Sequence, residues 1–396
     1  MRLTGDLGQL TYCSNIHPGE SWPELRRMLD ERVPKVKALA SPDAPMGIGL
    51  RIAAVAAEAL DAPAAWAELK AILDRHGLEV WTVNGFPYGP FHGTAVKENV
   101  YQPDWRSPHR LAYTNRLADL LADLQPAGGF ASLSTVPGTF KPLAAGNEAA
   151  MAEAMLRHVA HCMDLADRTG RTVALAIEPE PFCFLETIAE TVAFFEQHLF
   201  SDAAVAALAD FARVSRSEAA RALPVHLGLC YDVCHAAVEY EDPELSLSAL
   251  EMVGIPIHKL QLSAALRVPN VDAAARAALA AFAEPTYLHQ VIARDGDGAL
   301  RGHLDLPLAL ERGEASDGEE WRIHFHVPIF ADRLERFATT QPFLEAVLAR
   351  HRARPITRHL EVETYTWDVL PAAHRAVAVE VAIARELAWV RDRLEP

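Results

Sequence analysis

The hydrophobic positions of this chain form short β-branched or aliphatic runs that alternate with longer stretches of helical period. Short apolar runs bounded by turn residues indicate buried strands, and apolar residues spaced three and four apart indicate helices. We expect strands at Leu10–Ile16, Met46–Arg51, Glu79–Gly85, Phe130–Val136, Val173–Glu180, His226–Asp232, Ile257–Ser263 and Arg358–Thr364. Helical stretches lie between them, including Ala64–Arg75, Arg110–Leu124, Glu148–Thr169 and Thr187–Leu199.

This alternation predicts an α/β fold, a (β/α)8 TIM barrel. Strands separated by helical crossovers pair in parallel, and eight such units are the number that closes a barrel. A doubly wound open sheet has the same alternation and is the competing architecture. We predict one domain over residues 1–396, because α/β barrels extend well beyond the usual domain length.

Three segments are longer than a minimal barrel needs. Phe86–Pro108 follows the third strand and is rich in Pro, Gly and aromatic residues. Ser201–Pro224 adds helix before the sixth strand. Ala264–Phe337 follows the seventh strand and contains a helix, the turn RDGDG and the apolar run HFHVPIF. The first and third leave from C-terminal strand ends, so we expect long lid insertions over the barrel mouth after strands 3 and 7.

Composition narrows the classes of partner. The 37 Lys and Arg residues against 53 Asp and Glu give a net charge of −16, which argues against a nucleic-acid partner. The five cysteines form no CxxC pair and fit a reducing cytoplasm. No secretory pattern and no long apolar run is visible, so we predict a cytoplasmic protein with no direct membrane insertion. The sequence does not decide whether the protein forms a homo-oligomer.

Ionisable residues stand near the C-terminal ends of the last four predicted strands. Side chains alternate between the faces of a strand, so Glu178 shares a face with the small Ala174 and Ala176. The same parity groups the later strands as Gly228, Cys230 and Asp232; Lys259, Gln261 and Ser263; and His359, Glu361 and Glu363. The C-terminal strand ends of a barrel meet at one mouth, so these side chains should converge there.

Several buried carboxylates need either a shared cation or separate ion-pair partners, because burying an unpaired charge is costly. The first hypothesis is a divalent metal bound by the oxygens of Glu178, Asp232, Gln261 and Glu363. Mainly oxygen donors suit Mn or Mg, whereas a nitrogen from His235 would favour Zn, Co or Ni. The alternative is an ion-pair network with Lys259, Arg51 and Arg358.

The set resembles the xylose-isomerase-like TIM-barrel superfamily of sugar isomerases and epimerases. There the fifth and eighth strands end in glutamate, the sixth in Asp-x-x-His, and the seventh in His, Gln or a similar ligand; the matching residues are Glu178, Glu363, Asp232 with His235, and Gln261. Over nearly the whole chain, phrases such as YCSNIHPGESW, VNGFPYGPFHG, STVPGTFK, IEPEP, YDVCH, KLQLS, HFHVP and LEVETYTW are similar to EboE-type metabolite traffic proteins. Gln261 stands where histidine is common in the parent family.

The resemblance implies metal chemistry on two adjacent oxygens of a hydroxy-carbonyl substrate, whose intervening C–H becomes acidic. One glutamate removes the proton and a second acid, or the same one, returns it; a hydride shift is the variant. Glu178 and Glu363 are the candidate catalytic residues, each able to act as ligand and base. Glu361 lies deeper as a support residue, and Glu180 and Glu186 are the alternatives to Glu178 if the strand ends later.

Further polar residues near the predicted mouth are candidates for binding substrate. They are His235, Asn15, Arg51, Asn84, His92, His326 and Lys259. Arg51 would suit a phosphate or carboxylate group. His326 and His324 form an H-x-H pair that could chelate a metal or be structural in the lid, and Tyr287 and His289 are weaker candidates.

The sequence therefore predicts a metal-dependent isomerase or epimerase that acts on a small sugar- or cyclitol-like metabolite, with Mn, Mg, Zn or Co as cofactor. The competing hypothesis is a non-catalytic metabolite carrier that uses the same site at the barrel mouth. An abasic-site endonuclease shares the fold, but it needs a His-rich zinc cluster and a basic cleft, and the acidic balance argues against it.

Overall fold

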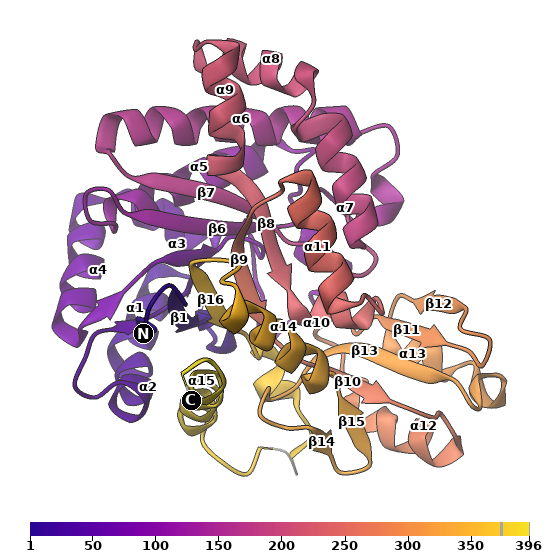
Figure 1. Ribbon diagram of the computed structural model, residues 1–396. Helices are drawn as coiled ribbons and strands as arrows, with labels where there is room; N and C mark the ends of the chain where they lie inside the picture. Colours follow the sequence, from indigo (N-terminus) through magenta and orange to yellow (C-terminus); the bar gives the residue numbers. More distant parts are fainter. Residues whose placement is uncertain (373–374, 396) are drawn as a thin grey trace.

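The computed structural model describes residues 1–372 and 375–395. Its centre is a curled eight-stranded parallel sheet with the order β1-β16-β9-β8-β7-β6-β5-β3 (Figure 1). These strands are β1 (Gln9–Tyr12), β3 (Leu50–Arg51), β5 (Thr82–Asn84), β6 (Phe130–Thr135), β7 (Thr172–Ile177), β8 (Leu227–Asp232), β9 (Ile257–Leu262) and β16 (His359–Val362). Neighbours around the sheet follow chain order without the reversal that defines a doubly wound sheet. The TIM-barrel prediction is confirmed.

The two edge strands of the sheet, β1 and β3, are joined through Gly49. Its N–H donates to Tyr12 O at 3.0 Å, and its carbonyl accepts from Ser14 N at 2.8 Å. A Cβ at this position would lie 1.3 Å from Glu361 Oε2, so only glycine fits between the two strands. The absence of a side chain at Gly49 thus lets the sheet curl closed around an inward-facing glutamate.

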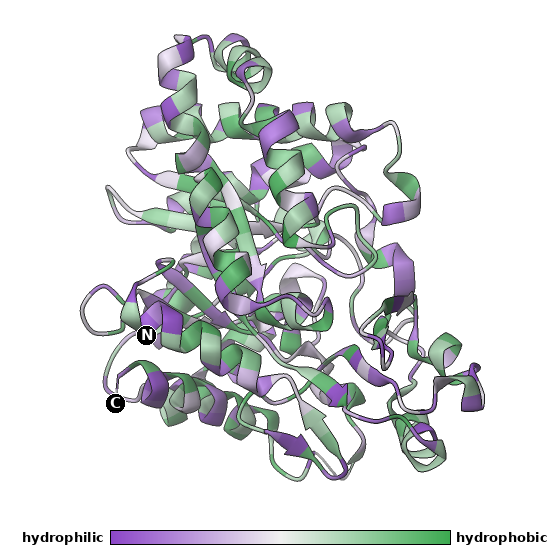
Figure 2. Cartoon of the chain, turned by 45° about the vertical axis from the view of Figure 1, so that its right-hand side comes forward, coloured by the Kyte–Doolittle hydropathy of each residue, from purple (hydrophilic) through white to green (hydrophobic). Residues whose placement is uncertain are grey.

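Helices surround the barrel and connect its strands (Figure 1). They are α1 (Trp22–Glu31), α2 (Val33–Ala40), α3 (Ala54–Ala59), α4 (Pro63–His76), α5 (Pro108–Asp123), α6 (Glu148–Thr169), α7 (Ile188–Phe194), α10 (Val233–Val238), α11 (Pro243–Val253), α14 (Gln341–Ala353) and α15 (Val379–Leu394). Figure 2 shows these helices banded in hydrophobic and hydrophilic colours, as expected for elements that pack on one side only. The predicted helix Glu148–Thr169 coincides with α6, whereas the predicted Thr187–Leu199 is α-helical to Phe194 and π-helical over Phe195–Leu199.

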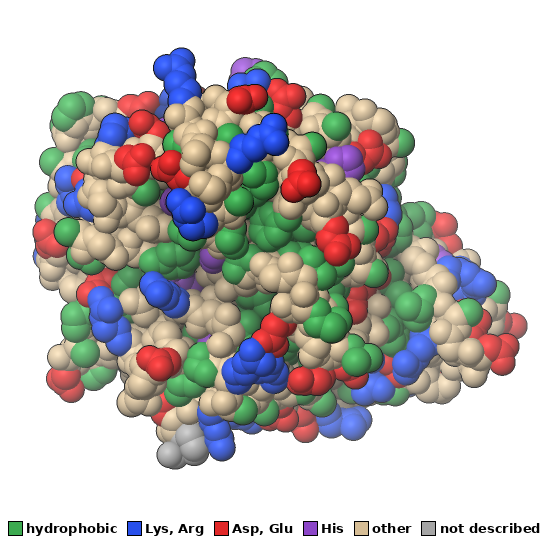
Figure 3. Space-filling view, turned by 45° about the horizontal axis from the view of Figure 1, so that its top comes forward, with side chains coloured by type: hydrophobic (Ala, Val, Ile, Leu, Met, Phe, Trp, Pro, Cys, Tyr) green, Lys and Arg blue, Asp and Glu red, His purple; other side chains and the backbone are tan. Residues whose placement is uncertain are grey.

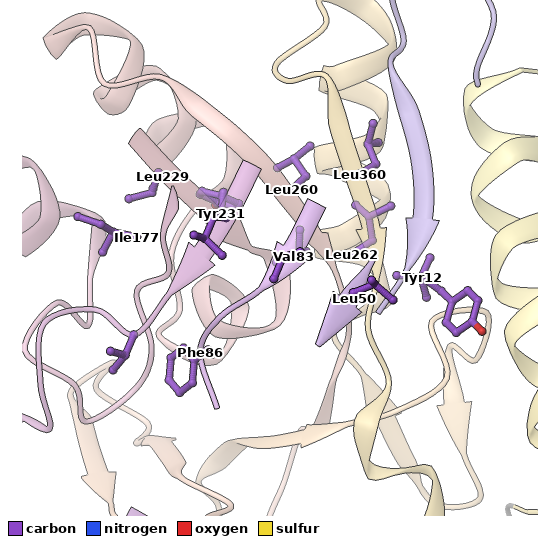
Figure 4. Packing of buried hydrophobic residues seen from close by; sticks show 14 of the residues in the cluster. Tyr12, Leu50, Val83, Phe86, Ile177, Leu229, Tyr231, Leu260, Leu262 and Leu360 are labelled. Carbon is purple, nitrogen blue, oxygen red and sulfur yellow. The ribbon is translucent and has the colours of Figure 1, made fainter. Parts of the chain in front are cut away.

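Alternate residues of the barrel strands are hydrophobic and buried. Leu229 and Tyr231 of β8, Leu260 and Leu262 of β9, and Leu360 of β16 belong to one cluster (Figure 4). The residues between them in sequence are small or polar, and they occupy the opposite face of each strand. The strand parity therefore collects the ionisable side chains inside the barrel.

Several predicted strands are shorter than expected, and two of them change at the closure of the sheet. The segment predicted as Met46–Arg51 is divided into β2 (Met46–Gly47), which pairs with β4 (Leu78–Glu79), and β3, which pairs with β5. The segment predicted as Leu10–Ile16 ends at Tyr12 and continues as a 3-10 turn over Ser14–Ile16. Both changes occur where the chain passes Gly49, at the closure of the sheet.

The three long segments fold as separate additions. The second forms α8 (Asp202–Ala212) and α9 (Arg216–His226). The third builds an antiparallel sheet, in the order β12-β11-β13-β10-β15-β14, beside the barrel (Figure 1). Its elements are β10 (Ala265–Val268), α12 (Ala273–Leu279), β11 (Val291–Arg294), β12 (Leu300–His303), α13 (Leu306–Leu310), β13 (Glu320–His326), β14 (Arg333–Leu334) and β15 (Phe337–Thr339). The sequence pattern predicted only one strand-like run there.

The first and third insertions meet over the C-terminal ends of the barrel strands, as predicted for lids. Val96 N donates to Thr286 O at 2.8 Å, and Lys97 Nζ lies 2.6 Å from both Tyr287 O and Asp305 Oδ2. On the face in Figure 3, Lys and Arg side chains are dispersed among acidic ones without a continuous basic patch. Within the described ranges, no helix combines the length and the apolar character that a membrane span requires.

Candidate metal centre at the barrel mouth

Three carboxylates converge at the C-terminal ends of β7, β8 and β16. One oxygen each of Glu178, Asp232 and Glu363 lies within 4.8 Å of the other two, and the three residues are only 3–4% exposed. Glu178 N donates to Thr135 O and Glu363 N to Leu262 O, each at 3.1 Å, so both glutamates are fixed by the backbone just beyond the strand ends. We name this group the carboxylate trio.

Gln261, the fourth predicted ligand, is fully buried beside the trio. It is the register partner of Asp232 on one side and of Glu361 on the other. This register places it at the level of Asp232 inside the barrel. The structure therefore brings the four predicted oxygen donors to one end of adjacent strands.

The carboxylates of Asp232 and Glu363 are each anchored through one oxygen. Asp232 Oδ1 accepts from His235 N at 3.0 Å and Ser263 Oγ at 2.8 Å. Glu363 Oε1 accepts from Asn15 Nδ2 at 2.6 Å and from Asn84 Nδ2 at 3.1 Å. These contacts fix the orientation of both carboxylates toward the shared space.

Other oxygens of the trio lack a hydrogen bond. Among the described residues, Glu178 Oε2 and Asp232 Oδ2 are buried and have no hydrogen-bond partner. A buried carboxylate oxygen without a partner costs free energy that a bound cation would offset. The donor set therefore fits a divalent metal, and the trio is one of several residue groups here that could hold one.

Burial and mutual repulsion shift the acidities of these groups. Burial, together with the charges of Glu363 and Asp232, raises the pKa of Glu178 well above its ordinary value. Burial and the charge of Asp232 raise the pKa of Glu363 to about 7. Burial lowers the pKa of His235, but the nearby carboxylates, Asp232 foremost, outweigh it and raise the value to about 9. The site therefore stabilises positive charge.

The cations of the alternative ion-pair network lie elsewhere. Lys259 Nζ is 2.6 Å from Glu361 Oε1, one layer deeper, with both side chains fully buried. Arg51 lies 2.6 Å from Glu20 Oε2, and Arg358 stacks over the Phe130 ring. In the part of the chain that the structure describes, none of the three forms an ion pair with the trio. This distribution favours the metal hypothesis over the network.

A cavity of about 530 Å³, counted to its opening, leads to the trio. Its polar lining includes Glu178, Glu363, Asn15, Asn84 and His235. Its outer wall is a triangle of aromatic rings, Phe91, Tyr287 and Tyr365, with centroids 5.1–5.2 Å apart. The triangle joins the two lids to the segment after β16, so it separates the trio from solvent.

The other predicted binding residues do not line this cavity. Lys259 lies below the trio, and Arg51 contacts Gly19 O and Gly89 O as well as Glu20, so it holds the first lid. His92 packs against Phe91 at the rim. His326 is fully buried behind Tyr365, with 4.5 Å between ring centroids.

Several residues of the site escaped the sequence prediction. Tyr101 donates to Glu180 Oε1 at 2.9 Å and accepts from Gln290 Nε2 at 2.9 Å. Glu180 thus supports a hydrogen-bonded wall beside the trio and does not replace Glu178 in it. Tyr365 follows Glu363 by two residues, so its position after a functional strand end was a usable signal. Gln290 had no comparable signal.

Comparison with known proteins supports the fold assignment. Neither a protein-family model nor a curated protein sequence matches the chain. The structure is similar to a xylose isomerase-like TIM barrel protein from Mycobacterium smegmatis, solved in complex with magnesium, with a TM-score of 0.52 and 11% identity over 98% of this chain and 96% of that one. The chain thus has the fold of the xylose isomerase-like TIM barrels.

Two sugar epimerases are among the other similar structures. D-allulose 3-epimerase from Methylomonas sp., solved with D-allulose, has a TM-score of 0.46 and 13% identity over 99% of this chain and 97% of that one. L-ribulose 3-epimerase has a TM-score of 0.47 and 12% identity over 98% and 95%.

Proposed function

We propose that this protein is a divalent-metal-dependent isomerase or epimerase acting on a small sugar- or cyclitol-like metabolite. The observation that carries the proposal is the carboxylate trio: three buried carboxylates within 4.8 Å of one another at the end of a cavity. Glu178, Asp232, Gln261 and Glu363 would hold the metal. When bound, the metal would polarise the oxygens of a hydroxy-carbonyl substrate and acidify the C–H between them.

Glu178 is the better placed base of the two glutamates. Its Oε2 has no hydrogen-bond partner in the described chain, whereas Asn15 and Asn84 both donate to Glu363 Oε1. Transfer of a carbon-bound proton to Glu178 leaves the electron pair on the substrate, and return of a proton at another carbon or face gives an isomer or epimer. Because the proton removed from the substrate is replaced by another, the reaction needs no redox partner. The second oxygen of Glu363 can serve the return step.

The walls of the cavity suit a small polyhydroxylated ligand. The three-ring triangle supplies flat apolar surfaces, and Asn15 Oδ1 has no hydrogen-bond partner within the described residues and can accept from a hydroxyl. Closure by two lids would exclude water from the reacting carbon.

As a finer proposal, the protein serves the metabolite traffic of EboE-type proteins, which the phrases from YCSNIHPGESW to LEVETYTW support. The second candidate function is a carrier that binds the same metabolite without converting it. The buried trio and the lids would serve both roles, so the two functions differ only in whether the metabolite is converted.

A solvent-exchange experiment separates these functions. Protein loaded with Mn²⁺ or Mg²⁺ is incubated in D2O with ketoses, aldoses and cyclitols, followed by NMR and product analysis. Deuterium at carbon, or conversion without exchange by a hydride shift, supports the enzyme when Glu178→Gln abolishes it. Binding without exchange or product supports the carrier. Failure of every candidate to bind or react would count against both.

A further inference from the structure

Three histidines place their Nε2 atoms against one another beside the trio. His324 Nε2 lies 3.1 Å from His235 Nε2 and 3.3 Å from His326 Nε2. The three side chains are 6% exposed or less. His235 lies in α10, which directly follows β8. His324 and His326 belong to β13 of the long insertion and lie on the same face of that strand. The antiparallel sheet therefore carries two imidazoles to the third.

Hydrogen bonds on the far side of each ring decide which nitrogen is protonated. His235 Nδ1 lies 2.8 Å from Pro179 O, and His326 Nδ1 lies 2.9 Å from Glu363 O. A carbonyl oxygen only accepts, so both Nδ1 atoms carry the proton. In the neutral rings, the Nε2 atoms of both histidines are then unprotonated.

His324 is fixed in the same tautomer. Its Nδ1 lies 2.7 Å from Gln290 Oε1. The orientation of that amide is settled by Gln290 Nε2, which donates to Pro181 O at 3.2 Å and to Tyr101 Oη at 2.9 Å. Because Oε1 is therefore the acceptor, the His324 ring also donates from Nδ1. When all three rings are neutral, as metal binding requires, three Nε2 lone pairs consequently point into one small space.

Facing lone pairs repel unless a cation lies between them. One added proton can bridge only one of the two close nitrogen pairs and leaves the other unpaired. Nitrogen ligands on a tetrahedral zinc ion, with bonds of 2.0–2.1 Å, are separated by about 3.3 Å, which matches the observed contacts. Metal-bound histidines commonly donate their other N–H to a carbonyl or carboxylate oxygen, as all three do here.

A fourth ligand is already in place. Asp232 Oδ2 lies 3.8 Å from His235 Nε2, and one ligand atom each of Asp232, His235 and His326 lies within 4.8 Å of the others. This oxygen has no hydrogen-bond partner among the described residues. Asp232 thus belongs both to the carboxylate trio and to the histidine group.

We propose that His235, His324 and His326, completed by Asp232, form a second metal site that binds a transition ion such as Zn²⁺ or Co²⁺. It adjoins the carboxylate site, which the proposed function assigns to a separate ion. Imidazole ligands favour Zn²⁺, Co²⁺ or Ni²⁺ over Mg²⁺, so the two sites differ in metal preference. A pair of cations joined by one carboxylate could hold both oxygens of a substrate.

Metal stoichiometry tests this proposal without an activity assay. Chelator-treated protein is titrated with Zn²⁺ and with Co²⁺, and bound metal per chain is measured after gel filtration. The wild type should bind two equivalents, His324→Ala and His326→Ala one, and Glu178→Gln should lose the other. Visible absorption of the Co²⁺ protein and X-ray absorption of the Zn²⁺ protein report imidazole ligation directly, so the wild type remains informative even if a variant fails to fold.

A matched control is His226→Ala. His226 is buried, and its Nδ1 also lies 2.8 Å from a carbonyl, that of Val173, but it belongs to the opposite end of the barrel strands. It should retain both equivalents. Loss of metal in this variant would show that any buried histidine change disturbs binding and would remove the support from the other variants.

The outcomes separate this site from the proposed function. A single equivalent that only Glu178→Gln removes overturns the histidine site and leaves the carboxylate site intact. A single equivalent that only the His324 and His326 variants remove supports the histidine site and contradicts the metal-binding role of the trio. No imidazole signature in either spectrum, or no bound ion, overturns the proposal and leaves a shared proton between His235 and His324.

Discussion

Lys259 Nζ lies 2.6 Å from Glu361 Oε1 in the fully buried interior of the barrel, directly below the carboxylate trio. Glu361 Oε2 also accepts from Thr11 Oγ1 at 3.2 Å. The charge of Glu361, the largest opposing influence to burial, raises the pKa of Lys259 above its ordinary value. Lys259 therefore stays protonated, and each member of the pair depends on the other as its buried partner.

Lys259→Met should lower the free energy of unfolding by about 3–5 kcal/mol, because it leaves the Glu361 carboxylate buried without its partner. The double variant Lys259→Met with Glu361→Leu should recover most of that loss, since neither charge then remains. Urea denaturation of both variants and the wild type measures the difference. Equal stability of the single and double variants would contradict the pairing.

The carboxylate trio should make the metal-free protein less stable at neutral pH than in mild acid. The pKa of Glu363 is about 7 in the folded state against 4.5 ordinarily, so the folded state holds this proton more tightly than the unfolded state. The stabilisation that this proton gives the folded state is complete below pH 4.5 and is lost as pH rises through 7. Without metal, the free energy of unfolding of Glu363→Gln should therefore equal that of the wild type near pH 4.5 and exceed it by about 3 kcal/mol at pH 8.

Thermal denaturation of the two metal-free proteins across this pH range gives the comparison. The difference between them reports the proton of Glu363 together with its influence on Glu178, whose pKa the Glu363 charge raises. Added Mn²⁺ should make the wild type more stable than the variant at pH 8, because the variant lacks one ligand of the ion and binds it less tightly. A difference that does not change with pH would show that Glu363 keeps its ordinary acidity.

Asn15 and Asn84 should tune metal affinity without binding the metal themselves. Both donate to Glu363 Oε1, at 2.6 and 3.1 Å, and so hold the carboxylate in position. Asn15→Ala or Asn84→Ala should weaken metal binding by about 10–100-fold, the usual effect of losing a group that orients a ligand. Competition with a fluorescent chelator gives the dissociation constant, and the half-buried Asn147→Ala should leave it unchanged.

Gly49→Ala should destabilise the fold because its Cβ would lie 1.3 Å from Glu361 Oε2. Moving this glutamate disturbs the ion pair with Lys259, so a loss of about 3 kcal/mol or more is expected. Gly296→Ala is the matched control, since its Cβ would meet no atom within 4 Å. Similar melting temperatures for the two variants would show that the barrel closes without the close approach at Gly49.

Lys97→Met should loosen the contact between the two lids. Lys97 Nζ lies 2.6 Å from Tyr287 O and from Asp305 Oδ2, and no other lysine of the first lid is available to replace it. Hydrogen–deuterium exchange over residues 86–101 and 284–290 should become faster, while exchange of the barrel strands stays the same. Unchanged exchange in both lids would show that the aromatic triangle alone holds them.

The sequence predicted the barrel and the trio for the same reason. Side-chain alternation along a strand is local, so the parity that turns Leu229 and Leu260 outward also turns Asp232 and Gln261 inward. The roles of Arg51 and Lys259 depend instead on which carboxylate lies nearest to each of them in the folded chain. These carboxylates belong to Glu20 and Glu361, and the local residue spacing encodes neither pairing.

The histidine group was predicted only in part. The H-x-H spacing of His324 and His326 indicated a chelating pair, but His235 lies 89 residues before His324 in the chain. Their meeting depends on the pairing of β10 with β13 inside the long insertion, and the hydrophobic pattern did not reveal that pairing. Long-range antiparallel pairing is set by register and turns, and these are weak signals in a single sequence.

The hydrogen bond from Asn15 to Glu363 connects residues 348 positions apart. During synthesis, everything from the first strand to the seventh can be translated while the last carboxylate is still missing. The carboxylate trio is then completed only when the eighth strand inserts beside the first. Under the proposed function, the trio consequently captures its metal late in the maturation of this protein, and chains that stop before residue 363 should be made without that site.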